Sequence, residues 1–326
     1  MAPETEASSA PTLHLEAIRQ GGKKALARAL SQIEAKDGSQ EVATLLDEAV
    51  ACATAHVVGL TGPPGVGKST LINALIRQWR KNGERVGVLA VDPSSRFSMG
   101  ALLGDRTRLD TDPLDQNIFV RSMAARDRLG GLSHEAVAAI VLMRALFDRV
   151  LVESVGIGQS EADIAFAVDS VVLCIQPGSG DSLQFMKAGV MELPDIIAVT
   201  KADMEGLARC AKADVEGALS LSKSSAAHWR VPVLLISALK AIGLEQLTVS
   251  VDDHLRYLKA EQKLAALRES QQKVWLADRI RRKFGEVGLA QVDIETEIDQ
   301  AKGPFKADQI LSKTFLERLS GPSCSI

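Results

Sequence analysis

The sequence of 326 residues has few aromatic side chains, few cysteines and no long hydrophobic stretch. Only 4% of the residues are Phe, Trp or Tyr, so the hydrophobic core must consist mainly of Ala, Val, Leu and Ile. The four cysteines are scattered and form no CxxC pair, which argues against a disulfide framework. The longest apolar run, residues 136–143, is far shorter than the roughly 20 residues that a membrane-spanning helix needs. We therefore expect neither a membrane protein nor a disulfide-stabilised one.

No excess of basic charge is present either. The net charge is −3 and the isoelectric point is near 6.0, whereas proteins that bind nucleic acids usually carry a basic face. The first dozen residues contain neither a basic segment nor the apolar segment of a secretory signal. We expect a cytoplasmic protein that binds neither nucleic acid nor membrane.

The pattern of residues divides the chain into four segments. Residues 1–12 are rich in Ala, Ser, Glu and Pro, which predicts a disordered tail. Residues 13–55 have apolar side chains at helical spacing and predict an N-terminal helical extension. Residues 56–250 alternate short apolar runs with helical segments, and residues 251–326 are helical again. We expect the last segment to form a helical dimerisation region.

The apolar runs of the third segment predict its fold. Several of them, such as VGVLAV and VVLCI, are continuous rather than alternating, as in strands that are buried on both faces of a parallel sheet. Their alternation with helices predicts an α/β fold with a doubly wound, mostly parallel sheet of about seven strands. The expected strands are 56–61, 85–92, 118–121, 149–153, 170–176, 195–200 and 231–237.

Residues 252–284 contain neither Gly nor Pro. As one helix they would extend for about 50 Å at 1.5 Å per residue. A helix of that length is rarely covered by its own domain, so we expect a partner surface there, such as a second copy of the chain. The alternative is two ordinary helices with a bend near Ser270.

A phosphate-binding loop follows the first expected strand. Residues 62–69 read GPPGVGKS, which fits GxxxxGK[ST] between a strand and a helix. Glycines allow backbone N–H groups to surround phosphate oxygens, and the N-terminus of the helix favours negative charge. Lys68 is expected to reach the β- and γ-phosphates, and Ser69 to bind Mg²⁺. The expected nucleotide contacts here are Gly62, Pro63, Pro64, Gly65, Val66, Gly67, Lys68, Ser69 and Thr70.

Three carboxylates are candidates for the magnesium site and for phosphoryl transfer. Asp92 and Glu153 end expected strands, and Asp105 lies in a polar, Arg-containing segment. Glu153 opens the sequence ESVG, which resembles the DxxG switch of nucleotide hydrolases, so the N–H of Gly156 is a candidate γ-phosphate contact. Asp92, Asp105 and Glu153 are therefore predicted to act with Lys68 and Ser69. No activating side chain is obvious; Arg108 and Gln159 are candidates, against the alternative that they are ordinary solvated side chains.

The sequence Thr200-Lys201-Ala202-Asp203 predicts a preference for guanine. An Asp at the fourth position can accept two N–H bonds from guanine, and the stem of Lys201 can lie over the base. The first residue departs from the commoner NKxD, which has Asn. The sequence Ser237-Ala238-Leu239 at the last expected strand suits a loop behind the base, so GTP and GDP are favoured over ATP as ligands.

At this point the sequence resembles the MeaB/ArgK family of GTPases, to which the human mitochondrial protein MMAA also belongs. The resemblance covers about residues 13–320, and the segments that carry it are VDPSS at 91–95, GDRTR at 104–108, RSMA at 121–124, LGGLS at 129–133, VESVGIGQSE at 152–161 and TKAD at 200–203. It implies a P-loop NTPase of the SIMIBI type that binds GTP and Mg²⁺.

The resemblance also implies a cellular role. Members of the family act as homodimeric chaperones of adenosylcobalamin-dependent methylmalonyl-CoA mutase, gating cofactor loading and protecting the enzyme from inactivation. Ser69, Asp92, Asp105 and Glu153 would surround Mg²⁺. A third switch from Gln176 to Lys187 would signal to the mutase, and the C-terminal helices would form the dimer contact. The residues expected to signal are Gln159, Gly178, Gly180, Asp181 and Lys187.

Two other functions are less well supported by the residues. Delivery of nickel or zinc would need soft or imidazole ligands, but Cys174 lies inside an apolar strand and the five histidines are isolated. A kinase-like role in amino-acid transport, which the ArgK name suggests, would need an acceptor site or a membrane association. The basic residues 279–283 suit the end of a helix instead.

Overall fold

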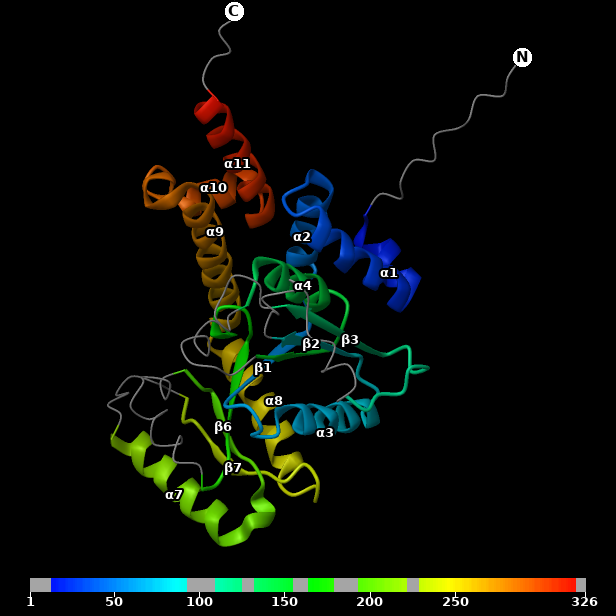
Figure 1. Ribbon diagram of the computed structural model, residues 1–326, viewed down its shortest axis with the longest axis vertical. Helices are drawn as coiled ribbons and strands as arrows, with labels where there is room; N and C mark the ends of the chain where they lie inside the picture. Colours follow the sequence, from blue (N-terminus) through cyan, green and yellow to red (C-terminus); the bar gives the residue numbers. More distant parts are fainter. Residues whose placement is uncertain are drawn as a thin grey trace, which may run out of the picture. The chain divides into compact units, whose positions relative to one another are not determined.

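The computed structural model describes residues 13–92, 109–124, 132–154, 164–178, 193–221 and 229–320, with only the backbone of Asp92 (Figure 1). Its chain forms two compact units. One contains residues 53–275, and the other contains residues 1–52 together with 276–326. Within the described residues, no helix is both long and apolar enough to cross a bilayer.

A seven-stranded, all-parallel sheet forms the centre of the larger unit, as the sequence predicts. The strand order is β3-β2-β4-β1-β5-β6-β7. Because β1 lies between β4 and β5, the loop that follows β1 emerges in the middle of the sheet's carboxyl edge, where open α/β sheets bind their ligands. The strands are β1 (His56–Thr61), β2 (Val86–Asp92), β3 (Ile118–Ala124), β4 (Arg149–Glu153), β5 (Ser170–Ile175), β6 (Ile196–Val199) and β7 (Val233–Leu235).

The continuous apolar strands are buried on both faces, and successive side chains enter different cores. In β5, Val172 and Cys174 belong to a core with helices α3 (Lys68–Lys81) and α8 (Leu244–Ala260). Leu173 and Ile175 belong to a second core with α7 (Glu205–Leu221). This alternation is what a strand with a two-residue repeat requires when helices cover both faces.

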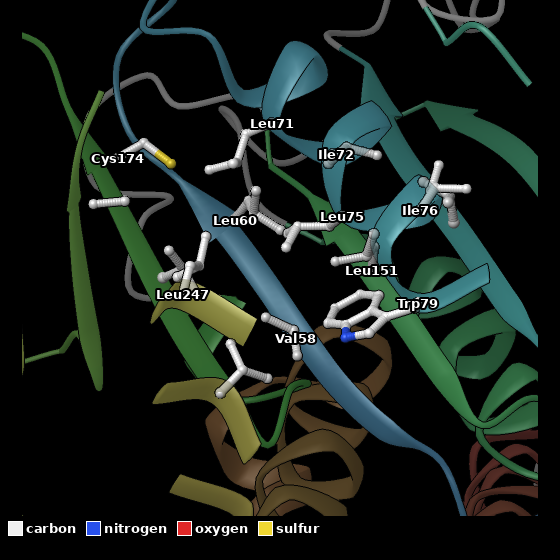
Figure 2. Close-up of a cluster of buried hydrophobic side chains, with 14 of the residues drawn as sticks. Val58, Leu60, Leu71, Ile72, Leu75, Ile76, Trp79, Leu151, Cys174 and Leu247 are labelled. Carbon is white, nitrogen blue, oxygen red and sulfur yellow. The ribbon is translucent and has the colours of Figure 1, made fainter. Parts of the chain in front are cut away.

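The first of these cores fixes α3 beneath the phosphate loop. Figure 2 shows Leu71 and Leu75 of α3 directed towards Val58 and Leu60 of β1. Trp79, one turn after Leu75, is only 1% exposed, so α3 is anchored along much of its length. Burial of a side chain of this kind stabilises the fold by roughly 1.5–3 kcal/mol.

On the other face, the helix α4 (His134–Arg144) contacts β1, β2 and β4. The side chain of Ser133 caps α4 by accepting a hydrogen bond from the N–H of Ala136 at 3.1 Å. Gly87 of β2 allows α4 to approach closely, because a Cβ atom there would lie 2.6 Å from the terminal methyl of Met143. A larger residue at Gly87 would displace this helix.

The smaller unit consists of helices from both ends of the chain, namely α1 (Leu15–Ala35), α2 (Gln40–Ala51), the end of α9 (Lys263–Leu289), α10 (Ile294–Ala301) and α11 (Pro304–Ser320). The carboxylate of Asp47 on α2 caps α11 by accepting the N–H groups of Phe305 at 3.1 Å and Lys306 at 3.0 Å. On the same unit, Asp308 of α11 binds both Arg279 and Lys283 of α9. The cap from Asp47 joins helices that are more than 200 residues apart in the chain.

The prediction of one long helix over residues 252–284 is wrong. Helix α8 ends at Ala260 and α9 begins at Lys263. Between them Gln262 has a φ of +54°, a left-handed conformation that a continuous helix does not contain. The alternative of two helices is confirmed, but the break lies at residues 261–262 and not near Ser270, which lies within α9.

Candidate nucleotide-binding site

The phosphate loop connects β1 to α3 at the carboxyl edge of the sheet. Gly62, Gly65 and Gly67 have φ angles of +134°, +73° and +103°, which residues with a side chain rarely adopt. At Gly62 the space is restricted as well, because a Cβ atom would lie 2.2 Å from the carbonyl oxygen of Cys174. The loop therefore needs glycine, and it leads directly into the N-terminus of α3, where the helix dipole favours an anion.

Lys68 is held inside the loop. Its side chain is largely buried, and its Nζ donates hydrogen bonds to the carbonyl oxygens of Gly62 at 2.8 Å and Pro63 at 3.2 Å. The ammonium group is thus positioned by backbone atoms of the loop itself. A phosphate that enters this loop would meet a positive charge already inside it.

Ser69, at the start of α3, contacts Glu153, the last residue of β4. The hydroxyl of Ser69 donates to Oε1 of Glu153 at 2.9 Å, and Glu153 pairs in register with Leu60 of β1. A hydroxyl and a carboxylate are the hard oxygen ligands that Mg²⁺ prefers, so these two residues fit a magnesium ion at the phosphate loop. The backbone places Asp92 at the end of β2, beside the strand that carries Glu153.

Several predicted residues lie outside the described part of the chain, namely Asp105, Arg108, Gly156, Gln159, Gly180, Asp181 and Lys187. Gly178 is described and has a φ of +72° after the end of β5. Within the described residues, no group of three or more His, Cys, Asp or Glu side chains could hold a metal ion. The roles of Asp92 and Asp105 at a magnesium site therefore remain predictions.

A cavity of about 220 Å³ opens beside the phosphate loop. Its lining combines the loop and the start of α3 with the segments that follow β6 and β7, which are the predicted base-recognition segments. The lining residues are Val66, Gly67, Thr70, Leu71, Thr200, Lys201, Asp203, Met204, Ile236, Ser237, Ala238 and Leu239. The mixture of apolar walls and one carboxylate suits a planar base with N–H donors at one edge.

Asp203 is exposed at this cavity and is oriented by its neighbour Ser237. The hydroxyl of Ser237 donates to Oδ1 of Asp203 at 2.5 Å and accepts a hydrogen bond from the N–H of Lys240 at 3.3 Å. The hydrogen bond from Ser237 lowers the pKa of Asp203. The carboxylate is therefore ionised near neutral pH and ready to accept two N–H groups.

Thr200 connects the base-recognition segment to the phosphate loop. Its hydroxyl oxygen lies 2.8 Å from the carbonyl oxygen of Val66 and 3.0 Å from that of Ile175. Its backbone N–H donates to Ile175 as well, at 2.7 Å. The sequence pattern did not identify this role, although a hydroxyl at the end of a buried apolar strand is a signal that a partner must exist.

Lys201 has a left-handed backbone, with a φ of +53°. Its Nζ lies 2.5 Å from Oε1 of Gln176, the first residue after β5. Gln176 was expected to begin a switch that signals to the mutase. No pattern in the sequence predicts this contact, because 25 residues separate the two positions.

Cys174 is fully buried in β5. Burial raises the pKa of its thiol to about 12, so it remains protonated near neutral pH. A protonated, buried thiol suits a core residue better than a metal ligand or a nucleophile.

The comparisons with known proteins agree with this geometry. The family model of the methylmalonyl Co-A mutase-associated GTPase MeaB matches residues 26–290. The chain belongs to the MeaB family. It is thus a P-loop GTPase.

Relatives of this GTPase come from several kingdoms. A putative GTPase of Pyrococcus horikoshii is 38% identical over 309 residues, which are 92% of this chain and 96% of the relative. The methylmalonic aciduria type A homolog of Mus musculus mitochondria is 36% identical over 80% of this chain and 66% of its own length. The GTPase ArgK of Escherichia coli is 32% identical over 93% of both chains.

A solved structure also resembles the model along nearly its whole length. The structure of a LAO/AO transport system kinase superposes with a TM-score of 0.69 at 27% identity, covering 97% of this chain and all of the other. The resemblance to the MeaB/ArgK family that the motifs indicate is thereby confirmed, as are the fold class and the GTPase activity.

Proposed function

We propose that this GTPase is a chaperone of adenosylcobalamin-dependent methylmalonyl-CoA mutase, which gates loading of the cofactor and protects the mutase from inactivation. The observation that carries the proposal is the match of residues 26–290 to a family described as mutase-associated. The similarity to the mouse mitochondrial methylmalonic aciduria protein supports the same link to methylmalonyl-CoA metabolism.

The described residues account for part of the chemistry. Lys68 and the N-terminus of α3 bind phosphate oxygens, while Asp203 and Lys201 bind guanine. Ser69 and Glu153 would hold Mg²⁺ together with Asp92 and Asp105, and the bound ion would neutralise charge on the β- and γ-phosphates. Phosphoryl transfer to water depends on positioning and charge neutralisation more than on covalent chemistry.

We further propose that hydrolysis is slow in the isolated protein and faster with the mutase. A partner can accelerate hydrolysis by positioning residues at the γ-phosphate, for which Asp105, Gly156 and Gln159 are the candidates that the sequence predicts. The segment from Gln176 to Lys187 would transmit the nucleotide state to the mutase.

A homodimer is part of the same proposal. The smaller unit carries exposed apolar side chains on α11, where Leu316 is 60% and Leu319 is 75% exposed. Leu316 and Leu319 lie three residues apart and so share one face of the helix. Light scattering on the full chain tests this: a Leu316→Lys, Leu319→Lys double variant that keeps the mass of a wild-type dimer would exclude this face.

The decisive experiment measures GTP turnover by the purified chain, alone and with stoichiometric methylmalonyl-CoA mutase, with ATP as the nucleotide control. Stimulation of GTP hydrolysis by the mutase, and no hydrolysis of ATP, is the expected result. A Lys68→Ala variant serves as the matched control for contaminating activity, because it lacks the phosphate-binding ammonium. Equal GTP turnover with and without the mutase would contradict the coupling.

A kinase-like role in transport is the second candidate, favoured by the name of the similar solved structure. The two functions differ in the fate of the γ-phosphate. GTP that is labelled at this position gives only inorganic phosphate if the protein is a switch. It gives a labelled protein or small-molecule acceptor if the protein is a kinase.

A further inference from the structure

The end of β5 contacts each part of the nucleotide site in turn. The carbonyl oxygen of Cys174 lies close to the backbone of Gly62 in the phosphate loop, where a Cβ atom would be only 2.2 Å away from it. The carbonyl oxygen of the next residue, Ile175, accepts the backbone N–H of Thr200 at 2.7 Å and lies 3.0 Å from its hydroxyl oxygen. The third residue, Gln176, accepts a hydrogen bond from Lys201. The same strand end thus supports the loop for the phosphates and the loop for the base.

Lys201 differs from the other groups at the base cavity in its freedom of movement. It is exposed, and a lysine side chain in solution has about 2 kcal/mol of rotamer entropy to lose when it is fixed. To cover a base, its methylene stem must lie in one direction. An acceptor at the far end of the stem can impose that direction before the nucleotide arrives.

Gln176 has the properties of such an acceptor. It directly follows the buried strand β5, it is only partly exposed, and its Oε1 lies 2.5 Å from Nζ of Lys201. A neutral amide oxygen bound to an ammonium group is a charge-assisted hydrogen bond, which is stronger than one between two neutral groups. The ammonium is thus held at one end of the stem, and the backbone of Lys201 is held at the other by its neighbour Thr200.

We propose that Gln176 is a positioning residue of the guanine-nucleotide site, which fixes Lys201 so that its stem lies over the base. This role depends on the binding of guanine nucleotides and not on the identity of any partner. It acts through Lys201 alone, so its loss weakens stacking on any purine equally. Recognition of the guanine edge by Asp203 is unaffected.

The first test is the affinity for GDP, measured by isothermal titration calorimetry on the full chain. Gln176→Ala is expected to raise the dissociation constant about three- to tenfold, the effect of one hydrogen bond to a charged group on the scale of 1.4 kcal/mol per tenfold change. Gln176→Glu keeps an oxygen acceptor and adds a negative charge, so it is expected to restore the wild-type affinity. Gln116→Ala, at an exposed position before β3, is the matched control and should have no effect.

Two further readouts separate positioning from a general disturbance of the site. Lys201→Met keeps an apolar stem but lacks the ammonium, so adding Gln176→Ala to Lys201→Met should cause no further loss. The ratio of the dissociation constants for GDP and inosine diphosphate, which lacks the 2-amino group that Asp203 accepts, should be the same in Gln176→Ala as in the wild type.

The opposite results would overturn the proposal. Additive losses in the double variant would show that Gln176 acts by another route than Lys201. A reduced preference for GDP over inosine diphosphate would show that the variant displaces Asp203 and disturbs the loop as a whole. If Gln176→Ala folds poorly, a Gln176→Glu variant with impaired GDP affinity and a normal unfolding transition would equally exclude the role.

Discussion

Thr200 Oγ1 lies 2.8 Å from the carbonyl oxygen of Val66, so the strand end that precedes the base-recognition residues is bonded to the phosphate loop. The commoner sequence has Asn at this position. The side chain of Thr is shorter than that of Asn and donates through its hydroxyl group. This hydroxyl lies between two carbonyl oxygens, those of Val66 and Ile175. Replacing Asn by Thr at position 200 therefore keeps a side-chain donor that links the base-recognition segment to the phosphate loop. This agrees with the membership of a GTPase family.

Thr200→Val removes this donor while it preserves the shape of the side chain. Because the two carbonyl oxygens are buried, we expect a loss of about 1–3 kcal/mol in the free energy of unfolding and a weaker affinity for GTP. Thr200→Ser retains the hydroxyl and should retain most of both. Urea denaturation and nucleotide titration of the two variants provide the measurement. Equal affinities for GTP in Val and Ser variants would show that the link does not shape the site.

The hydrogen bond between Ser69 and Glu153 leads to a prediction about magnesium. Glu153→Gln can still accept the hydroxyl of Ser69, but it lacks the negative charge that attracts the cation. We expect GTP turnover to fall by about 100-fold or more, as is typical when a charged group at a reacting phosphate is lost. Binding of GDP in the presence of a chelator should be unchanged.

The matched control is Ser69→Ala, which removes the other proposed ligand from the same site. If both variants lose turnover at low Mg²⁺ and recover part of it at high Mg²⁺, the two residues share the ion. A Glu153→Gln variant whose turnover and Mg²⁺ dependence equal those of the wild type would place the metal elsewhere.

The fold could be predicted from the sequence because its strands are continuous apolar runs. All seven expected strands occur in the described structure, and β1 and β4 occupy the expected residues. The position of the break between α8 and α9 could not be predicted, since Gln262 adopts its left-handed conformation in a segment without Gly or Pro. Local propensity favours one helix there, and tertiary packing overrides it.

The candidate site could be predicted only in part for a related reason. The phosphate loop and Asp203 belong to local patterns with fixed spacing. The contacts of Thr200 with Val66 and of Lys201 with Gln176 join residues that are 134 and 25 positions apart. Such contacts follow from the order of strands in the sheet, which the apolar runs alone do not determine.

A substitution at Asp203 tests base recognition directly. Asp203→Asn replaces one acceptor with an N–H₂ donor, which no longer matches the N–H groups of guanine but matches the 2-oxo group of xanthine. We expect the affinity for GTP to fall on the order of 10- to 100-fold, because one hydrogen bond is lost and the new N–H₂ group faces an N–H donor of guanine. The affinity for xanthosine triphosphate should rise in the same variant. Competition with a fluorescent guanine nucleotide measures both, and an unchanged preference for GTP would place the base at another site.

A buried chain of hydrogen bonds at the amino edge of the sheet makes the stability depend on pH. Ser170 Oγ lies 2.7 Å from Nε2 of His56 and 2.7 Å from Nδ1 of His254. His254 Nε2 lies 3.2 Å from Oδ1 of Asp195. Burial lowers the pKa of His56 to about 3 and that of His254 to about 4, and it raises the pKa of Asp195 to about 7.

The signs of these shifts predict opposing contributions to stability over the same range of pH. Asp195 binds a proton more readily in the folded protein than in the unfolded chain, so its contribution is full below the ordinary pKa of 3.8 and is lost as the pH rises from there to about 7. Asp47, whose pKa burial raises to about 6, adds to the same loss. The two histidines remain neutral when folded but are protonated below their ordinary pKa of 6.5 when unfolded. Stability is therefore lost as the pH falls from about 6.5 towards 4.

Between about pH 4 and 6 the two carboxyl groups and the two histidines offset one another, so we expect these four groups to leave the free energy of unfolding nearly flat there, which urea denaturation between pH 4.5 and 8.5 would measure. Asp195→Asn removes one of the opposing contributions, because the amide does not titrate, so the free energy of unfolding of this variant should rise with pH between about 4 and 6.5. His254→Gln should have the opposite effect, a fall with rising pH in this range, since the unfolded chain then gains one proton fewer below pH 6.5. If neither variant alters its slope, the titration of other groups controls the stability, and the chain from His56 to Asp195 has only a structural role.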